Sequence, residues 1–290
     1  MRITGARLMS LNQAATAAHQ ETLASAAEQV TSGKRVTTPS DDPIAWAAAQ
    51  RANVRKLVTA GGTAAMETAR DRLSETDAAL ATIGDAVSQV RSLAIQGAND
   101  SYSPTSRKEI GLQVRALFEG ALRAANQQSA NGEYLLAGSS SLAQPFTAAG
   151  AYVGDAATRS LDNGTLASIS GSSLTAANGV DVLPLLARVA AALDANDTAA
   201  LATTIGELDA AVRQVGVART HGGAASSVLE TTLNANAQLE DNLTKEIARH
   251  VEVDTVAAAT KLAKASQALE ASRLISSHIM SLLDPRNMGL

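Results

Sequence analysis

Two neighbouring carboxylates, Asp41 and Asp42, come nearest in this chain to a catalytic or metal-binding pair. Such a pair could share acid and base work or hold a cation. However, Ser40 precedes the carboxylates and Pro43 follows them. Ser and Asp are favoured helix N-caps, and Pro is favoured in a first helical turn. We therefore interpret Ser40, Asp41, Asp42 and Pro43 as a helix cap and connector.

The other side chains that could support chemistry are dispersed. The four histidines, none of which has HExxH or comparable ligand spacing, are His19, His221, His250 and His278. The absence of cysteine excludes disulfides, thiol nucleophiles and thiolate metal sites. Gly33-Lys34 lacks the upstream glycine that a phosphate-binding loop requires. We therefore predict no catalytic residue, no cofactor and no metal, and expect the protein not to be an enzyme.

Composition narrows the classes of partner. The net charge is −4, without a basic block or interleaved aromatics, so nucleic-acid binding is not expected. No run of about 18 apolar residues occurs, which argues against membrane insertion. Polar residues interrupt Leu8–Ala18, so we expect no cleaved signal peptide. Only 2% of the residues are aromatic, and alanine supplies much of the apolar content, which favours elongated helical packing over a compact globule.

The C-terminal stretch carries a heptad pattern. One row recurs every seven residues at Val251, Ala258, Ala265, Ser272 and Ile279, and a second lies four positions on at Thr255, Leu262, Leu269, Ser276 and Leu283. Together these rows predict the a/d seam of a coiled coil. Because alanine and serine fill much of the seam, it is too thin to fold alone and requires a partner.

The N-terminal stretch 1–32 is the simplest such partner. Its apolar stripe has helical spacing and comprises Leu8, Leu11, Ala15, Ala18, Thr22, Ala26 and Val30. Gly33 is expected to end this helix. We predict coiled-coil and subunit packing by Leu8, Leu11, Ala15, Val30, Val251, Leu262, Leu269, Ile279 and Leu283. For the interior helices, 43–129 and 183–250, an intramolecular bundle without a partner is the alternative.

Between the ends, the pattern predicts helices interrupted by one polar stretch. A helix is expected over 43–98, with a clear apolar register at Leu73, Thr76, Leu80, Ile83, Val87, Val90 and Ala94. From 131 to 182 the chain is rich in Gly, Ser, Thr and Asn. Short β-type runs there, Tyr134–Ala137, Tyr152–Val153 and Leu166–Ile169, predict a small β-rich insertion. Helices resume after Pro184, Gly222-Gly223 is expected to break one, and a last helix is expected over Ser226–Leu283.

The predicted fold class is mainly α: an elongated helical bundle and coiled coil built from paired N- and C-terminal segments, with a small β-rich insertion in mid-chain. We divide the chain as follows: 1–42 and 251–290 as the two halves of a terminal coiled-coil domain, 43–130 and 183–250 as the two halves of a helical bundle, and 131–182 as the β-rich insertion.

Particular residues resemble a known family. Val30–Val36, followed by Pro39–Pro43, resembles the N-terminal signature of bacterial flagellins and their hook-associated relatives. The last forty residues look like the C-terminal helix of the same family, at Asp254, Leu262, Gln267, Leu269 and Ser281–Leu283. Met1–Thr4, Ala130–Ser139, and Tyr152–Asp155 with Arg159 are similar to the hook-associated branch that joins hook to filament. The insertion is short for the family, and the turn Thr220–Gly223 departs from its usual pattern.

The resemblance implies a structural subunit of the flagellum at the junction of hook and filament. Such proteins pass unfolded through a type III export apparatus without a cleaved signal peptide, and a chaperone binds the C-terminal helix. Their terminal helices, disordered in the monomer, pair when the extracellular subunits assemble with like subunits, a neighbouring hook-associated protein and flagellin. A filament flagellin is the nearest alternative, and a non-flagellar helical coiled-coil adaptor a more remote one.

Overall fold

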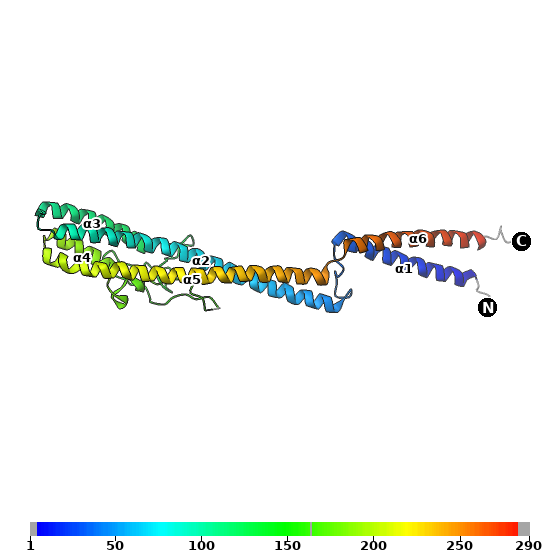
Figure 1. Cartoon of the computed structure of the whole chain (residues 1–290). Coiled ribbons are helices and arrows are strands. Elements are labelled where there is room, and N and C mark those ends of the chain that lie inside the picture. The colour runs from blue at the N-terminus through cyan, green and yellow to red at the C-terminus, as the bar shows by residue number, and fades with distance from the viewer. Residues whose placement is uncertain (1–4, 163, 284–290) are drawn as a thin grey trace. The chain divides into compact units, whose positions relative to one another are not determined.

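The computed structural model describes residues 5–162 and 164–283; Met1–Thr4, which is part of the family resemblance, lies outside it. Within its helices, the side chains of Leu8 and Leu283 also lie outside the description. The helices (Figure 1) are α1 (Gly5–Ser32), α2 (Pro43–Ala98), α3 (Pro104–Ala125), α4 (Val182–Asp194), α5 (Thr198–Val251) and α6 (Thr255–Leu283), with short 3₁₀ turns η1 (Gly171–Leu174) and η2 (Ala176–Asn178). The prediction of a mainly helical fold is therefore confirmed. None of the described helices is both long and apolar enough to cross a membrane.

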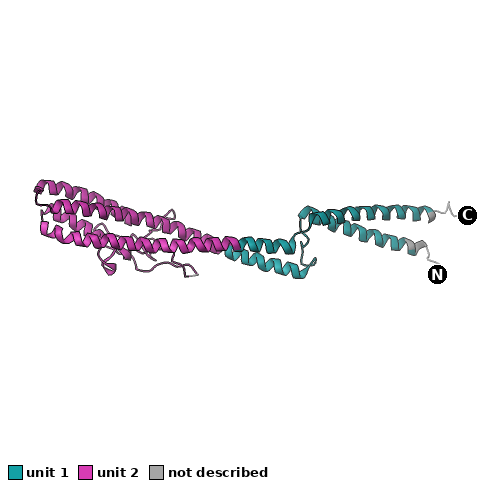
Figure 2. Ribbon diagram, viewed as in Figure 1, with its two compact units in different colours: residues 1–59, 239–290 teal, residues 60–238 magenta. Residues whose placement is uncertain are grey.

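The chain separates into two compact units (Figure 2). The terminal unit combines Met1–Thr59 with Leu239–Leu290, and the central unit is Ala60–Gln238. The terminal unit therefore joins the two ends of the chain, whereas α2 and α5 each contribute to both units. The finer division into bundle halves and a separate insertion stays a prediction.

In the terminal unit, α1 and α6 pack against each other in antiparallel directions. Asn12 Nδ2 donates to Ser276 Oγ at 2.8 Å, and the hydroxyls of Thr16 and Ser272 are 2.8 Å apart. The buried residues of α6 are mostly small and comprise Ala258, Ala265, Leu269 and Ser272. The contact is close because these side chains are short, but it removes little apolar area from water.

The same unit holds a second pair of helix segments, the start of α2 and the end of α5 (Figure 2). Its contact is again small: Ala45, Ala49, Ala52 and Leu243 are buried. Lys56 Nζ on α2 donates to Thr244 Oγ1 on α5 at 2.9 Å. Alanine at every third or fourth position lets the two backbones approach.

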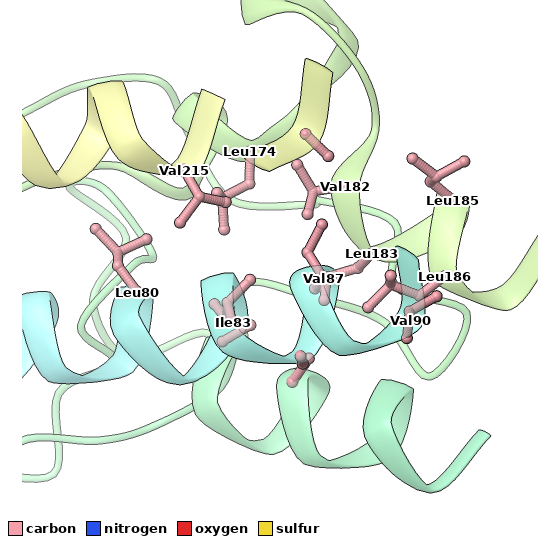
Figure 3. Close-up of a cluster of buried hydrophobic side chains, with 14 of the residues drawn as sticks. Leu80, Ile83, Val87, Val90, Leu174, Val182, Leu183, Leu185, Leu186 and Val215 are labelled. Atoms are coloured by element: carbon pink, nitrogen blue, oxygen red, sulfur yellow. The ribbon is translucent and has the colours of Figure 1, made fainter. Parts of the chain in front are cut away.

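The central unit contains the main hydrophobic core, which α2, α4, α5 and η1 enclose (Figure 3). The register predicted for α2 is confirmed, because the following residues are all buried: Leu73, Thr76, Leu80, Ile83, Val87, Val90 and Ala94. Helix α4 supplies the opposite wall with Leu183, Leu185 and Leu186, which are fully buried. Helix α3 packs against α4 at the edge of this core.

The prediction of a β-rich insertion is wrong for the residues that the structure describes, since none of them forms a strand. Three isolated bridges take the place of the predicted runs: Gln128↔Tyr134, Phe146↔Tyr152 and Ser160↔Leu166. Other backbone groups of the segment find partners in turns, as when Gly150 N donates to Thr147 O at 2.8 Å. The runs are too short to propagate a ladder, and the segment is held by buried side chains such as Leu136 and Phe146.

Two predicted helix boundaries are also corrected. Helix α5 continues through Gly222-Gly223, where a break was expected. A Cβ on Gly222 would lie 2.7 Å from Ile169 Cδ1, so this glycine lets the loop segment pack closely on α5. The expected helix from 226 to 283 is interrupted at 252–254. Asp254 caps α6 there, its Oδ1 accepting from Val256 N at 2.9 Å and Ala257 N at 3.1 Å.

Candidate subunit interface

The two connectors of the terminal unit, 33–42 and 252–254, are hydrogen-bonded to each other. Arg35 N donates to Val251 O at 2.7 Å, and Val253 N donates to Gly33 O at 3.1 Å. Gly33 has φ +67°, a left-handed conformation that glycine adopts without strain and that ends α1. Segments that are about two hundred residues apart in sequence are thus joined by backbone hydrogen bonds at the point where α1 ends and α6 begins.

Asp41 and Asp42 organise this connector. Asp41 Oδ2 accepts from the backbone N–H groups of Thr37 and Thr38, each at 2.8 Å, while Asp42 Oδ1 accepts from Ala45 N at 3.0 Å. The pKa of Asp41 is lowered, first by the bond from Thr38 N and then by that from Thr37 N. The pKa of Asp42 is lowered first by the bond from Ala45 N and then by Arg35. Both carboxylates are occupied as turn and cap acceptors, which leaves no free acid–base pair.

The remaining connector residues have supporting roles. Pro43 begins α2 directly after the cap residue Asp42. The hydroxyl of Ser40 lies 2.8 Å from that of Thr38. Arg35, for which no role was predicted, donates from Nη1 to Asp42 Oδ2 at 3.1 Å and from Nη2 to His250 O at 3.0 Å. The only feature of the sequence that could have indicated this bridging role is the position of Arg35 within the family-like signature Val30–Val36.

The predicted packing residues divide between the α1–α6 contact and the surface. Leu269 is buried in that contact, and Val251, Leu262 and Ile279 are half-buried. On α1, however, Ala15 is exposed, Leu11 is 58% exposed and Val30 is 38% exposed. The contact within one chain uses the face with Asn12 and Thr16 instead. Packing between subunits stays a prediction for all of these residues.

The terminal unit exposes many large apolar side chains. They are distributed over four helices: Leu11 and Val30 on α1, Ile44, Val54, Leu57 and Val58 on α2, Leu239 on α5, and Val256, Leu274, Ile275 and Met280 on α6. Exposed apolar residues that cluster on a small unit mark interaction surfaces. This unit therefore has the character of an assembly interface.

In the central unit, the segment Ala130–Ser139 is built around one carboxylate. Glu133 Oε2 accepts from Arg72 Nη1 at 2.7 Å and from Arg159 Nη1 at 2.9 Å. Burial raises the pKa of Glu133, but Arg159 and then Arg72 outweigh it and lower that pKa overall. Arg72 Nη2 also donates to Tyr134 O at 2.8 Å, and Arg159 Nη2 to Ser141 Oγ at 2.8 Å. This ion-paired cluster fixes the segment on α2.

A second carboxylate, Asp155, closes the same segment. It accepts from both the hydroxyl and the backbone N–H of Ser139, from Ser140 Oγ at 3.1 Å and from Ala157 N at 3.0 Å. These bonds, led by the Ser139 hydroxyl, lower the pKa of Asp155 to about 2. Tyr152 donates its hydroxyl to Asp155 O at 2.5 Å. These hydrogen bonds fix the backbone at the end of the family-like stretch.

Among the described residues, no group of three or more His, Asp or Glu side chains is placed to hold a metal ion. His19 and His250 belong to the terminal unit and His221 to the central unit. The polar side chains described here form helix caps, ion pairs and the contact between α1 and α6.

Comparisons with known proteins agree with this picture. The model of the bacterial flagellin N-terminal helical region matches residues 7–141. The chain is 30% identical over 130 residues to flagellar hook-associated protein 3 of Escherichia coli. The aligned region covers 44% of this chain and 41% of the Escherichia coli protein. It is 28% identical over 101 residues to a flagellin of Listeria monocytogenes, which covers 35% of each chain.

A solved structure shares the fold. The flagellar junction protein FlgL from Legionella pneumophila superposes with a TM-score of 0.56 at 16% identity, covering 71% of this chain and 100% of that one. In sequence, the chain spans less than half the length of the curated hook-associated proteins that it matches, at 41% and 49%.

The two chain ends of this helical protein pair through a thin seam, and its terminal unit exposes large apolar side chains. Over residues 7–141 the chain is similar to the N-terminal helical region of bacterial flagellins, and over 130 residues it is similar to a flagellar hook-associated protein.

Proposed function

We propose that this protein is a structural subunit of the bacterial flagellum and forms the layer that joins hook to filament. The observation that carries the assembly role is the terminal unit, where Leu11, Val256 and Leu274 remain exposed beside a contact made of small and polar side chains. Such a contact gives the single chain little stability, so burial between subunits would supply the rest. The proposed role is structural and involves no catalysis.

The junction position is supported by the relatives. Hook-associated protein 3 matches over 130 residues at 30% identity and over 155 residues at 27%, whereas the flagellins match over shorter stretches, 101 residues at 28% and 122 residues at 32%. The segment Ala130–Ser139, held by Glu133 and Asp155, supports the same choice because it resembles the hook-associated branch. Neighbours of the layer would be like subunits, another hook-associated protein and flagellin.

We further propose that the protein is exported unfolded, without a cleaved signal peptide, and acts outside the cell. The thin α1–α6 seam and the absence of cysteine suit a chain that must stay unfolded in a narrow channel. The exposed apolar side chains of α6 would give an export chaperone a surface to cover, including Leu274, Ile275 and Met280. Folding of the ends would then accompany assembly.

Deletion of the gene tests the junction role. Cells that lack this protein are expected to build hooks without filaments and to release flagellin into the medium, and the full-length chain should restore filaments. Filaments of normal number and attachment in the deletion strain would contradict the proposal.

A further inference from the structure

The burial of side chains along α2 and α5 is interrupted over one stretch of each helix. On α2, every residue of 53–68 is at least partly exposed, whereas Ala52 and Ala69 on either side are buried. On α5, every residue of 230–242 is at least partly exposed, again between two buried positions. Segments with few buried apolar contacts open locally at a low cost in free energy.

The two stretches lie against each other and meet through polar side chains. Asn236 Nδ2 of α5 donates to Thr63 Oγ1 of α2 at 3.3 Å and lies 3.8 Å from Met66 Sδ. About two turns away, Lys56 Nζ donates to Thr244 Oγ1 at 2.9 Å. Water competes for hydrogen bonds that are exposed, so these contacts add little stability to the helix pair.

Gly61 and Gly62 lie in the middle of the α2 stretch. A Cβ on either glycine would meet no atom within 4 Å, and neither glycine has a positive φ. By contrast, a Cβ on Gly97 of the same helix would overlap the side chain of Leu193, so packing requires that glycine. Neither packing nor backbone conformation requires the pair at 61 and 62. Adjacent glycines weaken a helix interior and are sites where helices kink.

The boundary between the terminal and central units crosses the same two stretches (Figure 2). It falls after Thr59 on α2 and after Gln238 on α5. We propose that α2 bends at Gly61-Gly62 and that α5 bends with it over 230–242, so that the two stretches form a hinge. Hinges concentrate a change of φ and ψ in a few residues, which glycine accommodates without steric cost. The packing within each unit is unchanged by such a bend.

The hinge adds a conformational property to the proposed structural role. A subunit of the junction layer has different neighbours on its hook side and on its filament side, and a bend lets one chain adapt to both. This use of the hinge rests on the proposed function. The hinge itself rests on the exposed stretches, the glycine pair and the polar contact of Asn236. Its test therefore uses the full-length monomer and does not depend on assembly.

Distances between two spin labels on α2 test the hinge directly, because the natural chain contains no cysteine to label. Gln50→Cys with Thr68→Cys places labels on either side of the glycine pair. Ser74→Cys with Ser92→Cys is the matched control, with the same separation of 18 residues in the part of α2 that packs on the core. All four side chains are exposed. In a straight helix, each pair of Cα atoms is about 27 Å apart.

Double electron–electron resonance gives the distribution of each distance. The distribution across the glycine pair is expected to be about twice as wide as that of the control, since only the first pair of labels spans a bend. Distributions of equal width would overturn the inference.

Replacing the glycines assigns the bend to them. Gly61→Ala with Gly62→Ala should narrow the distribution between labels at 50 and 68 to the width of the control, because alanine favours the helix and meets open space. Gly120→Ala, which changes an equally open glycine on α3, should leave that width as it is. A width that survives the double replacement would reject the glycine pair as the hinge.

Hydrogen exchange of the same full-length chain reports on α5. The amides of 230–242 are expected to exchange about tenfold faster than those of 205–218, where Leu208 and Val215 are buried. Equal rates would contradict the bend in α5. A narrow distribution in a protein that lies where hook meets filament would reject the hinge and leave the proposed function intact. A wide distribution in a protein found along the whole filament would uphold the hinge and reject the junction role.

Discussion

Thr16 of α1 and Ser272 of α6 meet hydroxyl to hydroxyl at 2.8 Å, with Ser272 buried in the contact between the helices. One turn away, the side-chain amide of Asn12 donates from Nδ2 to Ser276 Oγ, also at 2.8 Å. Hydrogen bonds between short polar side chains therefore set the register of α1 against α6, and alanine side chains fill the contact between the two helices. Such a contact specifies alignment more than it provides stability.

The first prediction concerns this polar pair. Thr16→Val leaves the buried Ser272 hydroxyl without its partner and should weaken the α1–α6 contact by about 1–2 kcal/mol. Adding Ser272→Ala removes the orphaned group, so the double variant should return close to wild type. Hydrogen exchange of the amides of α1 in the full-length monomer measures both effects. Equal loss of protection in the single and double variants would contradict the assigned hydrogen bond.

The second prediction concerns Leu269, which is buried against α1. Leu269→Asp places an unpaired carboxylate in the contact and should cost about 3–5 kcal/mol, enough to separate α1 from α6. The central unit should keep its thermal unfolding transition, whereas assembly and swimming should be lost. Gln267→Asp, on the exposed side of α6, is the matched control and should swim. Normal swimming of the Leu269 variant would remove the role assigned to this residue.

The third prediction concerns Glu133, which accepts from Arg72 and Arg159. Glu133→Gln leaves the largely buried Arg72 without a counter-charge and should destabilise the central unit by about 2–3 kcal/mol, below the full value for a buried pair because Glu133 is partly exposed. Glu75→Gln, which changes a nearby carboxylate, should alter the free energy of unfolding far less. Urea denaturation gives both values, and similar results for the two variants would reject the cluster as an organising feature.

The fourth prediction concerns acid stability and Asp155. Its pKa is about 2 in the folded chain, below the ordinary value of 3.8. A lowered folded pKa means that the stabilisation is complete above the ordinary value and disappears as pH falls toward 2. The melting temperature of the central unit should therefore decrease between pH 4 and pH 2. Asp155→Asn should be less stable at neutral pH and should flatten this dependence; an unchanged slope would contradict it.

The fifth prediction separates two adjacent glycines of α5. Gly223 has open space around it, so Gly223→Ala should stabilise the central unit by about 1 kcal/mol through helix propensity. Gly222→Ala has the same propensity gain but presses on Ile169, so it should fall below Gly223→Ala by about 1–2 kcal/mol. Thermal unfolding of the two variants checks this difference. Equal stabilities would mean that the loop segment does not require a glycine there.

Long, regular patterns made much of this fold predictable. The spacing of Leu80, Ile83 and Val87 reports burial because large aliphatic side chains have few alternatives to a core. Asp42 before Pro43 reports a helix start because both residues are favoured there for backbone reasons. Each of these signals is contained within one helix or one turn.

Other features depend on contacts between distant residues and could not be predicted in that way. From the sequence alone, either Leu11 or Thr16 of α1 could face α6. Thr16 faces α6 because its hydroxyl has a hydrogen-bond partner there, the hydroxyl of Ser272. Gly222 alone predicts a break in the helix. The structure gives this glycine another role, because the side chain of Ile169, from a loop distant in sequence, packs directly against it. The described residues of the polar segment after α3 form no strand, because carboxylates such as Asp155 and buried side chains fix its turns.

Immunogold electron microscopy of this protein on intact cells and isolated flagella tests the junction role most directly. We expect a single cluster of label where the hook meets the filament. Label along the whole filament would identify a flagellin instead, and flagella without any label would contradict a flagellar role.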